Sequence, residues 1–381
     1  GSSFTSLTAS PEILQEKSKQ TPGHRRLGGG IWTAAACLLL VLTLSGDRAL
    51  AAPAWDAAAC AGSVEIGDTV IPLGRAVGIK LFSDGVVVTG LSNVESTDSA
   101  SSPGREGGLR AGDVITHING QQVSTIEGVQ ALLAQQQEQP LTLQVQREDQ
   151  SLQLSVQPAQ NQDGAYQLGV WLRDSMAGIG TLTFYDPQSG VFAALGHGIS
   201  DVDTATLMPL ETGSIMKATV SDVKKGLSGE PGELHGVFDL QHDLGTLYAN
   251  TQQGIFGTLD DKALVQNGQG VEIASRDQVH TGKATILSNI AGDQVEEYEI
   301  EILTLYPEGD GDTRNLMLQV TDPRLLETTG GIVQGMSGSP ILQDGRLVGA
   351  VTHVLINEPS RGYGIFAENM VKTAQNSAQA A

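Results

Sequence analysis

Short apolar runs separated by glycine-rich turns fill the chain from residue 166 onward, and few folds accept such a pattern. Glycine makes up 47 of the 381 residues, and only 4% are aromatic. Runs rich in Val, Ile and Thr favour strands, and closely spaced glycines favour tight turns over long helices. The runs lie at residues 180–185, 191–195, 245–248, 263–265, 282–287, 299–306, 316–320 and 347–354. The pattern predicts an all-β C-terminal part, and two packed barrels or a sandwich both satisfy it.

Residues 64–158 show a different order of elements, which predicts a separate α+β module. The string Gly-Leu-Arg-Ala-Gly-Asp-Val-Ile begins at residue 108, and the Asn119-Gly120 pair after it suits a two-residue hairpin. Thr125 can then cap a helix whose apolar residues recur at helical spacing. Two alternating strands close the module, and a polar stretch near residue 160 marks its end. We therefore expect a second domain over residues 159–381.

Charge and composition restrict the class of partner. The formal net charge is −21 at pH 7, and the sequence contains no basic stripe. Because a phosphate backbone would be repelled, we expect no binding to nucleic acid. At 40% hydrophobic residues, the chain has enough apolar side chains for a core in each of two domains.

The N-terminal segment predicts export across a membrane. Four basic residues between positions 17 and 26 precede an apolar run at residues 31–44, and Ala-Leu-Ala at residues 49–51 has the spacing of a signal-peptidase site. The run is shorter than the roughly 20 residues of a membrane span. Residues 1–51 are thus expected to be an export signal or a marginal anchor, and residues 52–63 a linker.

Two glycine-flanked strings predict serine catalysis: Gly-Met-Ser-Gly-Ser-Pro at residues 335–340 and Gly-His-Gly at residues 196–198. A hydroxyl is a weak nucleophile near neutral pH and needs an imidazole to take its proton. Glycines on both sides of Ser337 let the backbone turn tightly and aim the amides of Gly335 and Ser337 at one oxyanion. Ser337 is therefore the expected nucleophile, and His197 the expected base.

Sequence spacing does not identify the third member of a catalytic triad. Asp322 lies fifteen residues before Ser337, whereas Asp239 and Asp243 lie between His197 and Ser337. A turn cap ahead of Pro323 is the structural alternative for Asp322.

Other polar groups near these strings give weaker signals. Ser339 is an alternative nucleophile, but Pro340 restricts its backbone. His353 is a second-choice base, although an interior strand position explains it better. A histidine and aspartate cluster could suggest a metal, but it lacks the His-Glu-x-x-His spacing, and a solvent-facing loop accounts for it. Its members are His235, Asp239, His242 and Asp243. We expect no metal and no cofactor.

Four strings together resemble the SpoIVB peptidases of endospore-forming bacteria, which join a PDZ module to a trypsin-like serine peptidase domain. The strings lie at residues 194–201, 321–323, 329–341 and 349–354. The resemblance implies a mainly β protein, with an N-terminal PDZ-like α+β module followed by a trypsin-like double β-barrel. It also implies Ser337 as nucleophile, His197 as general base and Asp322 as the acidic partner. In the usual trypsin layout the aspartate falls well before the serine, so Asp243 stays a competitor.

The string that begins at residue 108 resembles a PDZ domain as well. In such domains a peptide adds a strand beside the groove, and loop amides hold its terminal carboxylate. The resemblance implies a peptide-binding loop at Val77, Gly78 and Ile79.

The family resemblance implies an exported serine endopeptidase of sporulation. Its substrates would be membrane-tethered regulatory proteins between forespore and mother cell, and their cleavage would activate a late sigma factor. The PDZ-like module would recognise a substrate or the enzyme's own N-terminal segment. Two alternatives stay open: a catalytically silent PDZ-type adaptor and a general envelope protease.

Overall fold

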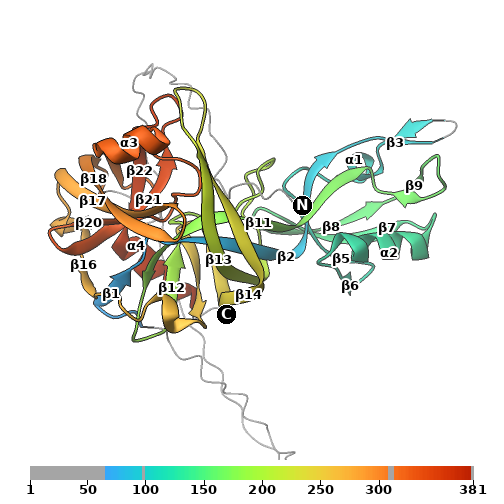
Figure 1. The fold of residues 1–381 in the computed structure, drawn as a ribbon. Coiled ribbons are helices and arrows are strands. Elements are labelled where there is room, and N and C mark those ends of the chain that lie inside the picture. Colours follow the sequence, from blue (N-terminus) through green and yellow to red (C-terminus); the bar gives the residue numbers. More distant parts are fainter. Residues whose placement is uncertain (1–64, 97–98, 308–312, 379–381) are drawn as a thin grey trace, which may run out of the picture. The chain divides into compact units, whose positions relative to one another are not determined.

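The computed structural model describes residues 65–96, 99–307 and 313–378 (Figure 1). The expected export segment, residues 1–51, and the linker, residues 52–63, lie outside these ranges. Within them, none of the helices combines the length and the apolar character that crossing a bilayer requires.

Six antiparallel strands close a first barrel. Each strand pairs with the next, and the last returns to the first, in the order β2–β11–β12–β15–β14–β13–β2. Their bounds are β2 (Ala76–Leu91), β11 (Val170–Tyr185), β12 (Val191–Ala194), β13 (Leu210–Lys224), β14 (Glu233–Thr251) and β15 (Gly254–Leu259). Val77, Ile79, Leu182 and Phe192 pack together inside it.

A second barrel closes in the same way, in the order β17–β18–β19–β22–β21–β20–β17. Its strands are β17 (Gly282–Ala291), β18 (Gln294–Leu305), β19 (Leu316–Val320), β20 (Pro340–Gln343), β21 (Arg346–Val354) and β22 (Arg361–Phe366). Ile286, Ile300, Leu318 and Val351 belong to its core. The predicted mainly β fold with a double barrel is confirmed.

Short elements connect and flank the barrels. β1 (Thr69–Pro72) pairs with β11 and with β16 (Val271–Ile273), which in turn runs parallel to β21. The helices are α3 (Pro323–Thr329) and α4 (Ala367–Ala378), and the 3-10 turns are η1 (Lys262–Leu264) and η2 (Arg276–Gln278). The strand expected at residues 263–265 is wrong: the Asp261 side chain accepts the N–H of Ala263 and starts a 3-10 turn.

The α+β module has its own apolar core, which includes Ile115, Val129, Leu133 and Leu143. Its elements are β3 (Val94–Glu95), β4 (Ala100–Ser101), α1 (Pro103–Glu106), β5 (Val114–Ile118), β6 (Gln121–Gln122), α2 (Ile126–Gln136), β7 (Leu141–Arg147), β8 (Gln150–Val156), β9 (Ala159–Gln160) and β10 (Tyr166–Gln167).

Two local predictions in this module are confirmed. Asn119 and Gly120 both take positive φ, at 50° and 78°, and join β5 to β6 as a two-residue hairpin. Thr125 caps α2 by accepting the N–H of Gly128 at 3.0 Å.

The module and the first barrel share two strands. The first half of β2 pairs with β13 and with the second half of β11, whereas Val86 and Val87 pair with β5. The beginning of β11, from Val170 to Arg173, pairs with the end of β2. The division into residues 64–158 and 159–381 stays a prediction, but β1 and the start of β2 pair with barrel strands from the second segment.

Candidate active site

The turn that carries Ser337 lies between α3 and β20 and depends on two glycines. Gly335 and Gly338 have φ of +99° and +97°, a region that glycine accepts without strain. In the described part of the chain, the N–H groups of Gly335 and Ser337 donate to no backbone carbonyl outside regular elements. Gly335 is buried and Ser337 partly exposed, and the oxyanion-hole assignment stays a prediction.

The two serines of this turn have different surroundings. Ser339 is fully buried, and its hydroxyl donates to the Met336 carbonyl at 2.7 Å. Ser337 is partly exposed, and its hydroxyl donates to the Thr352 carbonyl at 3.1 Å. Only Ser337 can meet a substrate without unfolding of the turn, which favours it as the nucleophile.

His197 follows β12 in a loop of unusual backbone shape. Leu195 and Gly196 have φ of 69° and 70°, and a β-carbon at Gly196 would lie 2.8 Å from Thr352 Cγ2. The His197 side chain is only 3% exposed. Its Nδ1 lies 2.8 Å from the Gly198 carbonyl, whereas its buried Nε2 has no hydrogen-bond partner.

The Gly198 contact fixes the tautomer of His197. A carbonyl oxygen only accepts, so Nδ1 must carry the proton and Nε2 must present its lone pair. In a triad a carboxylate holds the imidazole in this same tautomer. Here a main-chain carbonyl does so, and no motif in the sequence could have shown it.

Thr181 of β11 joins the turn that carries Ser337 to the loop that carries His197. Its N–H donates to the Ser337 carbonyl at 3.2 Å, and its carbonyl accepts the N–H of Leu195 at the same distance. Its buried hydroxyl also donates to the Gly335 carbonyl at 2.7 Å. A single residue of the first barrel thus holds the nucleophile turn of the second barrel beside the loop of the base. Sequence reasoning missed this residue.

His353 is a second histidine close to His197. Their ring centroids lie 5.7 Å apart, and His353 Nδ1 is buried without a hydrogen-bond partner. Burial, followed by the charges of His197 and Arg314, lowers the pKa of His353 to about 3. Burial lowers the pKa of both rings, so the pKa does not choose between them, and His197 as the base stays a prediction from its glycine-flanked string.

Asp322 does not reach His197. It is the N-cap of α3: its carboxylate accepts the N–H groups of Arg324 and Glu299 at 2.9 and 3.2 Å. The Arg324 guanidinium also donates to both carboxylate oxygens, and this hydrogen bond lowers the pKa of Asp322. The role implied for Asp322 is therefore corrected to that of a cap and ion-pair partner, the structural alternative raised by Pro323.

The other candidate carboxylates are also engaged elsewhere. Asp243 lies 3.1 Å from Lys80 Nζ, and Asp239 accepts from His242 Nδ1 at 3.0 Å. Within the described ranges, no group of three or more His, Cys, Asp or Glu side chains is placed to hold a metal ion.

The expected peptide-binding loop at Val77, Gly78 and Ile79 is also corrected. These residues lie inside β2 and pair with β11 on one edge and with β13 on the other. Val77 and Ile79 are completely buried in the first barrel. A strand with both edges occupied cannot accept a peptide.

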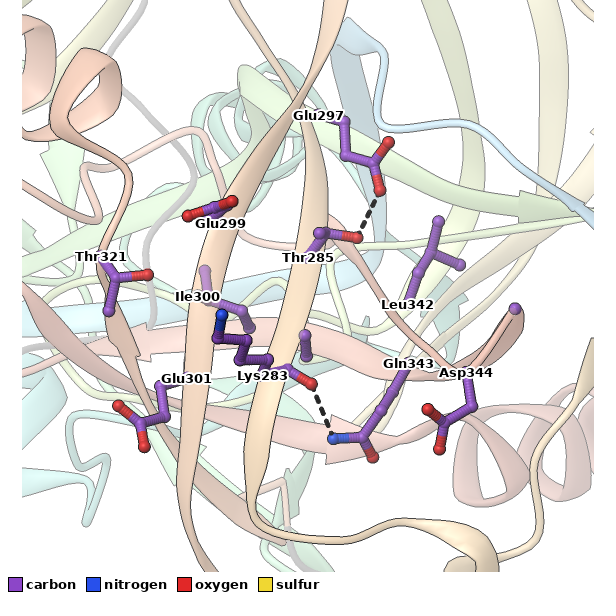
Figure 2. Close-up of a pocket in the computed structure, with 12 residues that line it drawn as sticks. Lys283, Thr285, Glu297, Glu299, Ile300, Glu301, Thr321, Leu342, Gln343 and Asp344 are labelled. Atoms are coloured by element: carbon purple, nitrogen blue, oxygen red, sulfur yellow. Dashed lines mark hydrogen bonds between the residues drawn. The ribbon is translucent and has the colours of Figure 1, made fainter.

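A pocket of about 550 Å³ lies on the wall of the second barrel (Figure 2). Its lining includes Glu299, Glu301 and Asp344, and Glu297 accepts a hydrogen bond from Thr285 within it. Neither Ser337 nor His197 is among the lining residues. This pocket is therefore not the catalytic site, although it adjoins the cap of α3 through Thr321 and Glu299.

Replacement of Asp322 tests the correction. Because asparagine caps a helix about as well as aspartate, Asp322→Asn should lower the free energy of unfolding only through the lost ion pair with the exposed Arg324, by about 1 kcal/mol. It should keep kcat within about threefold of wild type, in contrast to the roughly 10⁴-fold loss seen when a triad aspartate becomes asparagine. Denaturant titration and peptide hydrolysis measure the two effects. Asp243→Asn is the control, and a loss of 10³-fold or more in either variant would restore that aspartate to the site.

The two buried imidazoles predict a distinct pH dependence. Burial lowers the pKa of His197, only partly opposed by its hydrogen bond to Gly198, so the acid limb of kcat/KM should lie below pH 6.5. The unfolded chain binds protons at these histidines near pH 6.5 and the folded chain does not. Stability should therefore fall as pH drops below about 6.5, by up to about 1.4 kcal/mol per pH unit for each imidazole. Urea unfolding between pH 7 and 5 checks this, and His353→Asn should make the fall shallower.

Comparison with protein-family models identifies two parts of the chain. A family model described as SpoIVB peptidase S55 matches residues 164–371, more than half of the chain. A PDZ domain model matches residues 99–147. The predicted serine peptidase domain and PDZ domain are confirmed.

Other relatives are more distant. A Vibrio cholerae serotype O1 protein named "Putative zinc metalloprotease" is 27% identical over 180 residues, which are 45% of this chain and 35% of that protein. The match thus spans about a third of that relative's length. Among solved structures, the active form of the Rv3671c protease from M. tuberculosis has a TM-score of 0.30 and 13% identity, over 53% of this chain and 74% of that one. The HtrA-type protease AlgW with a decapeptide has a TM-score of 0.31 and 11% identity, over 54% of each chain. Similarities at this level carry no argument about activity.

Proposed function

Because the chain belongs to the SpoIVB peptidase S55 family, we propose that it is an exported serine endopeptidase of sporulation. Its substrates are membrane-tethered regulatory proteins in the space between forespore and mother cell, and their cleavage activates a late sigma factor. The basic, apolar and small-residue pattern of residues 17–51 supports export. The observation that carries the activity is the main chain of Thr181, which binds both the Ser337 turn and the His197 loop.

The reaction would follow from the geometry of the two loops. The Ser337 hydroxyl leaves the Thr352 carbonyl, gives its proton to Nε2 of His197 and attacks the peptide carbonyl. The amides of Gly335 and Ser337 hold the negative charge that develops on the carbonyl oxygen. His197 then passes the proton to the leaving amine, and water completes hydrolysis of the acyl-enzyme by the same route.

Labelling of the serine tests the activity. A fluorophosphonate should form a covalent adduct on Ser337 of the wild-type protein and none on the Ser337→Ala variant. Peptide mapping by mass spectrometry identifies the modified residue. An unlabelled wild-type protein that still binds peptides would instead support the silent adaptor.

The sporulation role needs a test in cells. In an endospore-forming host that lacks its own member of the family, this chain should restore a late sigma-factor reporter, and the Ser337→Ala variant should not. A general envelope protease would degrade unfolded casein and a membrane-tethered substrate equally well. Equal cleavage of both, without reporter activity, would argue against a dedicated regulatory substrate.

We propose that a peptide binds the PDZ module at an edge of β11, in place of the site expected from the sequence. From Val170 to Arg173, β11 pairs with β2 on one edge, and no other strand in the described ranges pairs with these residues. Helix α2 packs near this part of β11, and Asp174 accepts the N–H of Ile126 at its first turn. A peptide could add as a strand to this edge, with the exposed Trp171 beside it.

In this proposal the peptide is a substrate terminus or the protein's own N-terminal segment. A synthetic peptide of residues 12–30 should shift the fluorescence of Trp171 in a variant whose other tryptophans, Trp32 and Trp55, are replaced by phenylalanine. Binding that survives Leu172→Pro, which disrupts the β11 edge, would exclude this groove.

A further inference from the structure

We propose that the ion pair between Arg173 and Asp201 holds the loop between β12 and β13, residues 195–209 (the base loop), in the conformation that catalysis needs, so that both are positioning residues for His197. The proposal rests on the peptidase activity proposed above. Asp201 lies four residues after His197, and Arg173 lies on β11.

Asp201 is a completely buried charge that organises its own loop. Its Oδ2 accepts the N–H groups of Asp203 and Thr204 and the Thr204 hydroxyl, at 3.2, 2.9 and 2.8 Å. Its Oδ1 is buried and accepts no hydrogen bond of regular geometry. It forms an ion pair with Arg173, whose Nε lies 3.0 Å away. Arg173 is therefore the charge that compensates this oxygen, and its removal leaves a buried anion unpaired.

Arg173 also binds a second residue of the base loop. Its Nη2 donates to the Asp203 carboxylate at 2.8 Å, so the guanidinium spans two residues of the loop. From β14, Asn250 accepts the N–H of Ile199 and donates to the carbonyls of Ile199 and Met208, each at 2.8 Å. The segment after His197 is thus clamped between β11 and β14.

The same part of β11 reaches the PDZ module. Arg173 pairs with Val87 of β2, and the next residue, Asp174, holds the first turn of α2. A β-carbon at Gly112 of the module would lie 3.0 Å from Thr206 Oγ1 in the base loop. The base loop therefore contacts both the first barrel and the module, and Arg173 stands where the two meet.

The experiment compares Arg173→Met with a matched pair elsewhere in the chain. Arg147 and Asp113 form a second arginine–aspartate pair with similar burial: their side chains are 21% and 1% exposed, against 27% and 0% for Arg173 and Asp201. This second pair lies within the PDZ module, and Arg147 bonds only to Asp113 and the Gly108 carbonyl, although Asp113 follows Gly112, which lies beside Thr206. Arg147→Met thus removes a comparable ion pair that makes no hydrogen bond to Asp201 or Asp203.

Inactivation of the full chain by a fluorophosphonate is the readout, with kinact and KI determined separately. Arg173→Met should lower kinact by about 10²-fold at nearly constant KI, since a shift of about 1 Å in a catalytic group has effects of this size. Arg147→Met should stay within about twofold of wild type in both constants. Arg173→Lys, which keeps the charge but not the two-pronged grip, should recover part of the rate.

The outcomes separate this inference from the proposed function. A wild-type protein that never reacts would refute the peptidase, whereas a reactive wild type with equal kinact in Arg173→Met and Arg147→Met would refute the positioning role alone. If Arg173→Met does not fold by circular dichroism, Arg173→Lys decides: a kinact lowered about three- to tenfold supports the role, and a wild-type kinact overturns it.

Discussion

Alanine at Ser337 or at His197 should lower kcat/KM for peptide hydrolysis by about 10⁴- to 10⁶-fold. Neither residue contributes to catalysis without the other, because the hydroxyl needs a proton acceptor and the imidazole needs a nucleophile to activate. The Ser337→Ala/His197→Ala double variant should therefore be no slower than the worse single variant. Additive losses would mean that the two side chains act independently.

The measurement needs a control for folding, since His197 is buried and its loop is tightly packed. His197→Gln keeps much of the volume and should fold, yet it should lose nearly as much activity as His197→Ala. Thermal unfolding monitors the native state of each variant. A single variant that folds and keeps more than about 1% of wild-type kcat/KM would exclude that residue from catalysis.

The sequence predicted the elements whose signals are local. Asn119-Gly120 specifies its hairpin because both residues accept positive φ, and Thr125 specifies the start of α2 through one side-chain hydrogen bond. The strings around His197 and Ser337 were equally visible, because glycines flank both residues, and Gly196, Gly335 and Gly338 take positive φ. Each of these signals is complete within a few consecutive residues.

The errors concern contacts that no local sequence pattern identifies. Residues 77–79 look like a loop entering a strand, but pairing with β13 on the second edge, more than 130 residues away, makes them barrel interior. Asp322 looks like a triad member by its string, but Arg324 and the Glu299 N–H occupy its carboxylate. The group that orients His197 is a main-chain carbonyl, which every residue carries and no sequence pattern marks.

The coupling of the two catalytic loops also had no local signal. This coupling depends on Gly338, which has no side chain. The turn that carries Ser337 can therefore pack directly on the backbone of β11 and of the His197 loop. A β-carbon at Gly338 would lie 2.2 Å from the Thr181 carbonyl oxygen and 2.5 Å from the Leu195 nitrogen. Both neighbours are main-chain atoms, so no side-chain rotation relieves the clash.

Gly338→Ala should therefore separate the nucleophile from the base. We expect kcat to fall by at least about 10²-fold, because the turn must move away from Thr181. Gly345→Ala is the matched control: Gly345 also has positive φ, +74°, but no atom lies within 4 Å of an added β-carbon. That control should cost only the backbone strain of about 1–2 kcal/mol in unfolding free energy and leave kcat intact. Denaturant titration gives the free energy of unfolding, and peptide hydrolysis gives kcat. The rate of fluorophosphonate labelling reports the reactivity of Ser337 directly. Equal labelling rates in the two variants would show that close packing of this turn on β11 is not what holds Ser337 beside His197.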